Sequence, residues 1–339
     1  MTVAIAWPLR AAIGLLPALC FLAALLVIDS YKLVRLRTVM AVIGAGGAVA
    51  GICFLINLAV IDGAGVDFSS HSRLGAPLLE ESLKGAVIVA LIHTRRIGFL
   101  VDASVLGCAV GGGFSTVENL YYLLHLSDPN PAVWLVRGFG TAILHGGVQA
   151  IFAAQVLANA DRRGQLDARA VLPPLAVAVL IHAAFNQFIL PPVMETLLVL
   201  AVVPPLLLWV FVRSEHAVAE WIGPGFDADV ELLRLLDSGQ FSESPAGRYL
   251  YELRAHFSGE VVADLLCYLR LHVELALRAK GMLKLRENGI PATIGAETRE
   301  KLEEMRHLER SVGPTALRTL QPLLPMSRRD LWKFYLLSG

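Results

Sequence analysis

The segment PLLEESLKGAVIVALI, residues 77–92, joins an apolar run of the kind that enters membranes to three ionisable side chains. Glu80, Glu81 and Lys84 lie within five positions of one another. Insertion scales give a cost of about 2.5–3.5 kcal/mol for each ionised residue at the centre of a bilayer. A chain that carries this cost is expected to use these residues, so they are the first candidates for a functional site.

The composition of the whole chain favours a multi-pass membrane protein. Its 339 residues are 55% hydrophobic and its mean hydropathy is +0.61, both too high for a soluble domain of this size. The formal net charge is 0, which gives no reason to expect a nucleic-acid partner. The four cysteines are scattered without metal-ligand or redox spacing, so they are expected to fill apolar positions.

Seven apolar segments have about the length that crosses a membrane. They cover residues 11–29, 39–61, 75–93, 98–125, 132–158, 171–190 and 193–212. A helix rises about 1.5 Å per residue and needs about 20 residues to cross about 30 Å of hydrocarbon. The sequence therefore predicts an all-α fold in which residues 1–213 form a transmembrane bundle of about seven helices.

Charged residues between the spans set the expected orientation. Basic residues fall in alternate connections, at Lys32, Arg35, Arg37, Arg95, Arg96, Arg162, Arg163, Arg169 and Arg213. The other connections hold mainly acidic residues, with one arginine among them. The positive-inside rule then places the N-terminus outside and the C-terminus in the cytoplasm. The basic residues after the first span also favour a retained helix over a cleaved signal peptide.

Residues 214–339 differ in composition, because charged and apolar residues mix there at helical spacing. They are predicted to form a small all-helical cytoplasmic domain, divided by Gly223–Pro224, Pro245 and Gly313–Pro314. This domain carries no catalytic motif. Its charged run Glu297–Arg310 is expected to be a solvated helix face, with a cytoplasmic protein partner as the alternative.

Four predicted spans carry polar side chains that a lipid-facing helix would avoid. Besides the three residues above, these are Glu118, Asn119, Arg137, His145, His182 and Asn186. Counted at about 1.5 Å per residue, the glutamates and His182 fall within roughly 5–13 Å of the outer ends of their helices. His145 falls deeper, near ~20 Å, if its helix begins where the apolar run does. Three spans are therefore expected to bring polar groups together in the outer half of the membrane.

This set of side chains suits the activation of water. A carboxylate withdrawn from solvent can take a proton from water, a histidine can position the water, and an Asn amide can donate to an oxyanion. Glu118, His145 and His182 could also hold Zn²⁺, although no HExxH sequence is present. A histidine or Asn alone could instead form a hydrogen bond between helices. The Gly111–Gly113 run and Gln149 are expected to serve packing and hydrogen bonding.

Four short motifs resemble those of PrsW-type intramembrane proteases, which belong with the CAAX-protease and bacteriocin-processing superfamily. Glu80–Lys84 is similar to the EExxK motif of these proteases, and Gly113–Tyr121 to their GFxxxEN segment. Arg137 and His145 resemble the third element, and His182–Asn186 is similar to the closing HxxxN. The motifs occur in order on four predicted spans, and the tail lies outside them.

The resemblance implies a protease in a bacterial cytoplasmic membrane that cleaves a membrane-anchored protein, such as an anti-sigma factor, on its extracytoplasmic side. It implies Glu80 or Glu81 as the general base, tuned by Lys84, and helical spacing does not choose between the two. Glu118 and His145 would position water or a metal, within motifs that also contain Asn119 and Arg137. His182 and Asn186 would stabilise the tetrahedral intermediate. The cofactor is then either none or zinc.

Two other classes of function remain open on the sequence. Intramembrane Glu, Lys and His also build proton relays, so a proton-coupled transporter or sensor is one alternative, although no inverted repeat is evident. A non-catalytic binding or chaperone protein is the other. It would keep the membrane scaffold and use residues 214–339 as its interaction module.

Overall fold

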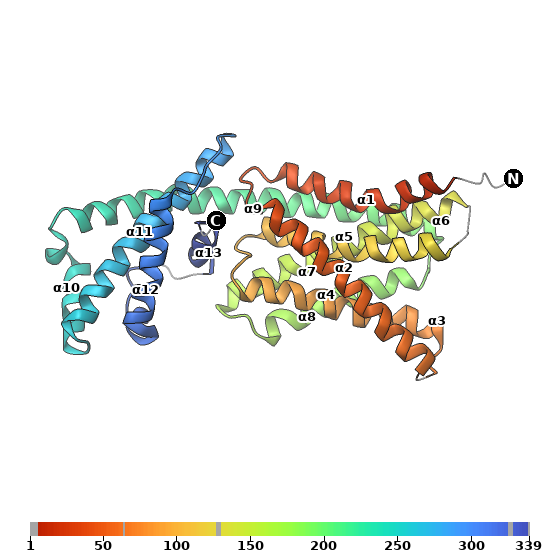
Figure 1. The fold of residues 1–339 in the computed structure, drawn as a ribbon, viewed down its shortest axis with the longest axis horizontal. Helices are drawn as coiled ribbons and strands as arrows, with labels where there is room; N and C mark the ends of the chain where they lie inside the picture. The colour runs from red at the N-terminus through yellow and green to blue at the C-terminus, as the bar shows by residue number, and fades with distance from the viewer. Residues whose placement is uncertain (1–5, 64, 127–129, 325–327, 338–339) are drawn as a thin grey trace. The chain divides into compact units, whose positions relative to one another are not determined.

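The computed structural model describes residues 6–63, 65–126, 130–324 and 328–337, and the regular structure within them is helical throughout. The chain divides into two compact units. The first contains the residues up to Asp29 and Leu33–Ser214, and the second contains Ser30–Lys32 and the residues from Glu215 onward. Figure 1 labels the helices and colours them from red at the N-terminus to blue at the C-terminus. The prediction of an all-α fold is confirmed.

Long helices joined by short irregular segments build the first unit. They are α1 (Trp7–Ile28), α2 (Leu36–Leu58), α4 (Ala76–His93), α5 (Leu100–His125), α7 (Ala142–Arg163), α8 (Ala168–Asn186) and the first part of α9 (Pro192–Asp237). Shorter pieces lie between them: α3 (Phe68–Ser70), α6 (Pro131–Leu135) and the π-helical turns η1 (Ala59–Gly63), η2 (His71–Gly75) and η3 (Val136–Thr141).

Six helical segments of the described chain are long and apolar enough to cross a membrane. They are Trp7–Ile28, Leu36–Gly63, Leu100–His125, Pro131–Arg163, Ala168–Asn186 and Pro192–Asp237. The seventh predicted span corresponds to α4, an 18-residue helix that contains two glutamates and a lysine. Those three residues lower its apolar character, yet α4 packs against α2, α5, α7 and α8. The multi-pass bundle is therefore confirmed, with α4 packed among four other helices of the first unit.

Helices α5 and α7 form the centre of the bundle. In the most apolar window of each span, 83% of the α5 residues and 78% of those in Pro131–Arg163 are buried, against 28–33% in the other four spans. The outer helices therefore present large apolar side chains to the surroundings, as expected of helices that face lipid. Asn119 of α5 and His145 and Gln149 of α7 are correspondingly buried.

Glycines allow α5 to approach its neighbours closely. A Cβ atom on Gly111 would lie 2.1 Å from the carbonyl oxygen of His145 in α7, and one on Gly113 would lie 2.1 Å from the carbonyl oxygen of Ile43 in α2. Gly112 between them faces open space, with nothing within 4 Å. Small residues at such crossings let helix backbones meet inside a membrane. The predicted packing role of this run therefore belongs to its first and third glycines.

We expect Gly111→Ala to lower the free energy of unfolding by about 1–3 kcal/mol, because the added methyl group would force α7 and His145 away from α5. Gly112→Ala is the matched control, since alanine there has room and raises helix propensity by up to about 1 kcal/mol. Thermal unfolding of the purified variants in detergent measures the difference. Equal stability of the two variants would contradict the close crossing of α5 and α7.

The second unit contains the end of α9, α10 (Pro245–Glu252), α11 (Gly259–Glu287), α12 (Ala296–Arg318), α13 (Arg328–Leu337) and the 3₁₀ turns η4 (Phe241–Glu243) and η5 (Leu253–Ala255). The expected break at Gly223–Pro224 is wrong, because α9 continues through it to Asp237. Lys280 of α11 packs there, with Nζ 3.0 Å from Oδ2 of Asp229 and 4.9 Å from the centre of the Trp221 ring. These contacts stabilise the continued helix.

The other two expected breaks in the tail are present. Pro245 stands in the first turn of α10, where its missing N–H costs nothing. Gly313 bends α12 with a positive φ of 79°, directly before Pro314. The positions of proline at a helix start and of glycine at a bend therefore agree with the backbone conformations that these residues prefer.

Candidate functional site

Glu81 lies at the centre of a buried polar cluster between α4, α7 and α8. Its side chain has 0% exposure. Oε1 is 2.5 Å from Nζ of Lys84 and 2.7 Å from Nδ1 of His182. Oε2 accepts a hydrogen bond of 2.6 Å from Nε2 of Gln149. Both oxygens are thus engaged by the protein, which leaves Glu81 little capacity to act on a further molecule.

Glu80 differs from its neighbour in having few contacts. Its side chain is 14% exposed, and its one recorded polar contact within the described chain is 3.9 Å, from Oε2 to Nε2 of His182. Consecutive helix positions are about 100° apart, so the two carboxylates leave α4 in different directions. His182 reaches both, with Nδ1 at Glu81 and Nε2 toward Glu80. Glu80 is therefore the carboxylate that remains available for chemistry.

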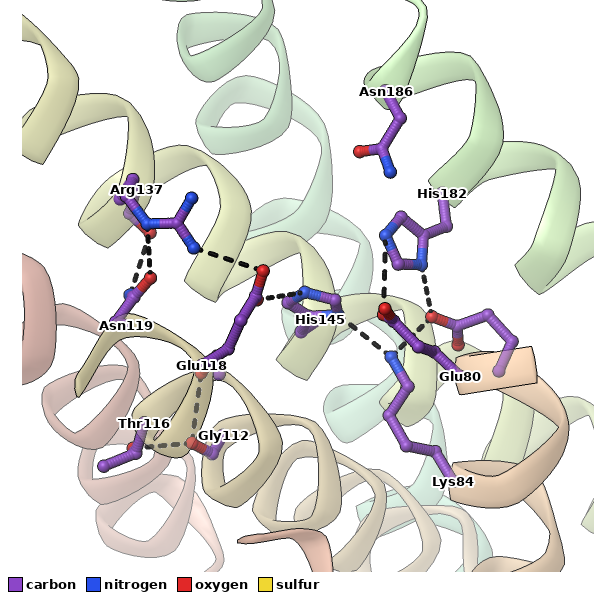
Figure 2. Close-up of polar contacts among 12 residues, drawn as sticks. Glu80, Lys84, Gly112, Thr116, Glu118, Asn119, Arg137, His145, His182 and Asn186 are labelled. Atoms are coloured by element: carbon purple, nitrogen blue, oxygen red, sulfur yellow. Dashed lines mark hydrogen bonds and ion pairs between the residues drawn. The ribbon is translucent and has the colours of Figure 1, made fainter. Parts of the chain in front are cut away.

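Lys84 and His145 link this cluster to α5. Nζ of Lys84 is 2.9 Å from Nδ1 of His145 and 4.4 Å from the centre of the Phe114 ring. An ammonium group only donates hydrogen bonds, so Nδ1 accepts and the proton of the neutral imidazole is on Nε2. Nε2 then donates to Oε2 of Glu118 at 3.1 Å. Figure 2 shows this chain from Lys84 through His145 to Glu118.

Arg137 binds Glu118 from the other side and is itself held by Asn119 (Figure 2). Nη2 of Arg137 is 3.1 Å from Oε1 of Glu118, and its Nε donates to Oδ1 of Asn119 at 2.9 Å. The guanidinium also lies 3.5 Å from the centre of the Tyr122 ring. Asn119 in turn donates from Nδ2 to the backbone carbonyl of Gly14 at 2.8 Å. Within the described residues, Arg137 therefore acts on Glu118 and Asn119 supports Arg137, with no recorded contact of either to Glu80.

Asn186 has no recorded contact with either glutamate among the described residues, and its amide binds the main chain. Its Nδ2 donates to the carbonyl oxygen of Ser72, in the π turn η2, at 2.9 Å. The structure thus gathers six of the nine predicted site residues around His145 and His182. It adds Arg137 and Asn119 through Glu118, and it gives Asn186 a backbone partner.

His145 lies among the polar residues, although counting from the start of its apolar run placed it deeper. The segment Pro131–Arg163 has 33 residues and would extend about 50 Å, well beyond a bilayer core. It also contains the π turn η3 before α7 begins at Ala142. The end of the helix is therefore a poor marker of the membrane surface.

Gln149 was expected to serve packing and hydrogen bonding, and the structure shows that its hydrogen bond is to Glu81. It lies one turn after His145 on the same face of α7, which is how it reaches the cluster. Its Oε1 is buried and has no hydrogen-bond partner among the described residues. The amide is oriented by its bond to the Glu81 carboxylate, which needs a donor.

Three side chains of the cluster have the composition of a zinc site. One donor atom each of Glu80, His145 and His182 lie within 4.8 Å of one another. The set expected from sequence contained Glu118, which instead binds Arg137 and His145. His182 fits a metal-binding histidine, because a carboxylate holds Nδ1 and orients the ring. His145 would have to exchange one of its two present contacts, and with that exchange the donor set fits zinc.

Comparison with known proteins gives one match. The family model described as PrsW family intramembrane metalloprotease matches residues 34–212, slightly more than half of the 339-residue chain. The matched region begins just before α2 and ends within α9, so it contains every residue of the polar cluster. No curated protein and no solved structure matches the chain.

Proposed function

The chain belongs to the PrsW family of intramembrane metalloproteases and is an integral membrane protease, and from this premise we propose that it cleaves a membrane-anchored protein with water activated at Glu80. One observation carries the proposal. Among the three glutamates of the cluster, Glu81 and Glu118 have both oxygens occupied by cationic or hydrogen-bonding partners. Glu80 stands beside them with a single polar contact recorded among the described residues, 3.9 Å from His182.

The proposed reaction is a hydrolysis in which Glu80 transfers one proton from water to the leaving amine. Its carboxylate takes a proton from water, the hydroxyl oxygen bonds to the peptide carbonyl carbon, and the carbonyl oxygen becomes an oxyanion. When the carbon–nitrogen bond breaks, the proton on Glu80 passes to the leaving amine. Glu81 fixes the orientation of His182 beside Glu80, and Lys84 balances the charge of Glu81. Glu118 orients His145 in the same way.

Glu80, His145 and His182 are the residues that would hold zinc in this site. A bound zinc ion supplies Lewis-acid polarisation and makes its water more acidic. A carboxylate has two oxygens, so ligation through one oxygen of Glu80 leaves the other to accept a proton. Glu81 can hold Nδ1 of His182 with or without the ion, whereas His145 would keep only one of its two partners, Lys84 or Glu118, when it binds zinc.

We expect purified protein to contain about one zinc ion per chain, as a site with three protein ligands does. His182→Ala should lose this zinc, since the histidine is held ready by Glu81. His125→Ala is the matched control, because His125 stacks on Tyr121 outside the cluster. Elemental analysis measures the zinc, and cleavage is followed before and after a chelator. Full cleavage by zinc-free protein would overturn the proposal that zinc takes part in the reaction. The mechanism in which Glu80 alone activates water would then remain.

The proposed function includes an orientation of the chain in the membrane and a class of substrate. Basic residues in alternate connections support an outer N-terminus and a cytoplasmic C-terminus in a bacterial cytoplasmic membrane. The family resemblance supports a substrate of the anti-sigma-factor type, cut on its extracytoplasmic side. A panel of single-span reporter proteins, tagged at both ends and co-expressed with the protease, tests both points. Cleavage outside the cytoplasm is expected, and failure to cut any reporter would overturn the proposal.

We also propose that residues 1–213 are the protease domain and residues 214–339 a separate cytoplasmic domain that binds a protein partner. The division of the chain into compact units near Ser214 supports this boundary. The family match ends at residue 212, which supports it independently. A version lacking the second domain should still cleave a reporter if the two domains have separate roles.

A further inference from the structure

The π turn η2, directly before α4, leaves one backbone carbonyl without its normal donor. The N–H of Ala76 donates to the carbonyl of His71, five residues earlier, which is the π-helical pattern. The next bond in that pattern would run from residue 77 to the carbonyl of Ser72. Residue 77 is proline and has no N–H. Ser72 therefore needs a donor from another part of the protein.

Asn186, the last residue of α8, supplies that donor. Its Nδ2 lies 2.9 Å from the Ser72 carbonyl oxygen in a partly buried position. A second side-chain bond holds the same turn to α2, with Nε2 of His71 2.8 Å from Oδ1 of Asn57. A carbonyl group that is withdrawn from water and has no donor destabilises a fold. The hydrogen bonds to Asn186 and Asn57 therefore fix the position of η2.

We propose that Asn186 is a positioning residue that replaces the main-chain donor missing at Pro77 and so sets the start of α4 against the end of α8. This proposal rests on the proposed function, because α4 carries Glu80. His182 lies one turn before Asn186 on α8, and its Nε2 is the group 3.9 Å from the Glu80 carboxylate. Fixing the Ser72 carbonyl to Asn186 therefore fixes Glu80 relative to His182.

The role differs from direct stabilisation of an oxyanion, which the resemblance implies for Asn186. A direct role would require the Asn186 amide in every active form of the protein. A positioning role requires only that the Ser72 carbonyl has a donor. Replacing Pro77 by alanine restores an N–H five residues after Ser72, so the two roles predict opposite results for a double variant.

The test compares four variants on one reporter that the wild-type protein cleaves. Asn186→Leu should lower kcat by about 10- to 100-fold with KM little changed, because small misplacement of a catalytic group has effects of this size. Asn186→Leu combined with Pro77→Ala should recover most of that kcat. Pro77→Ala alone should stay active. Gln187→Leu, which changes the next residue and an amide without a recorded side-chain hydrogen bond, should also stay active.

Each result decides the proposal. Recovery of kcat by Pro77→Ala supports it, and so does recovery of folded protein if Asn186→Leu alone does not accumulate in membranes. A folded double variant that stays as slow as Asn186→Leu would overturn the proposal. It would support a direct role of the Asn186 amide in stabilising the oxyanion. Full activity of Asn186→Leu would also overturn the proposal. If the wild type cleaves no reporter, the proposed function fails first, and thermal unfolding of the same variants tests the Ser72 bond separately.

Discussion

Glu80→Gln is expected to abolish reporter cleavage while leaving the stability of the protein almost unchanged. The glutamine keeps the shape of the side chain but cannot accept the proton of water. Loss of a general base costs about 10²- to 10⁴-fold in rate. The stability should be preserved because Glu80 makes one polar contact of 3.9 Å and is 14% exposed. Kinetics on a cleaved reporter and thermal unfolding in detergent measure the two effects.

Ser82→Ala is the matched control for this experiment. Ser82 lies two positions from Glu80 on the same helix, and no hydrogen bond of its side chain is recorded among the described residues. It should cleave at the rate of the wild type. A folded Glu80→Gln variant that also cleaves at that rate would show that another group takes the proton from water.

The membrane helices could be predicted from sequence because hydrocarbon imposes a length. Apolar runs of about 20 residues mark them, and the helices observed begin and end within a few residues of most predicted bounds. The end of the last run was less predictable. Gly223–Pro224 disfavours a helix locally, but contacts of α11 with α9 hold the helix through it. Long-range packing of this kind has no local sequence signal.

The choice between Glu80 and Glu81 shows the limit more clearly. On an isolated helix both carboxylates can reach Lys84, so spacing gives them equal roles. The structure separates them by what approaches from other helices. His182 from α8 and Gln149 from α7 occupy Glu81 and leave Glu80 nearly free. The contacts that distinguish the two glutamates join residues about seventy to a hundred positions apart in the sequence. Helical periodicity contains no information about such contacts.

π-helical turns explain two further departures from the sequence prediction. Adding one residue to a turn shifts every later side chain around the helix by about 100°. The turn η3 precedes His145, which contacts Lys84 and Glu118 although counting along a regular helix separated it from them, and η2 precedes Glu80. Asn186 was expected near the reacting atoms and instead meets η2. Such turns are common at functional sites, where they redirect side chains that a regular helix would place elsewhere.

Glu81→Gln is expected to give the opposite outcome to Glu80→Gln: a large loss of stability. Lys84 is fully buried, and its Nζ is 2.5 Å from the Glu81 carboxylate. Removing one partner of a buried ion pair leaves the other charge uncompensated, at a cost of about 3–5 kcal/mol. The variant should therefore unfold at a lower temperature in detergent and accumulate poorly in membranes. Cleavage should fall as well, because His182 loses the group that orients it.

The double variant Glu81→Gln, Lys84→Met separates stability from activity. Replacing both charges removes the uncompensated ammonium, and apolar replacement of a buried pair is often neutral for folding. Stability should therefore recover in the double variant, whereas cleavage should not, because His182 and His145 both lose their holders. A double variant that recovers cleavage together with stability would show that Glu81 supports the fold alone. Recovery of stability without cleavage would assign to the Glu81–Lys84 pair both support of the fold and the orientation of His182 and His145.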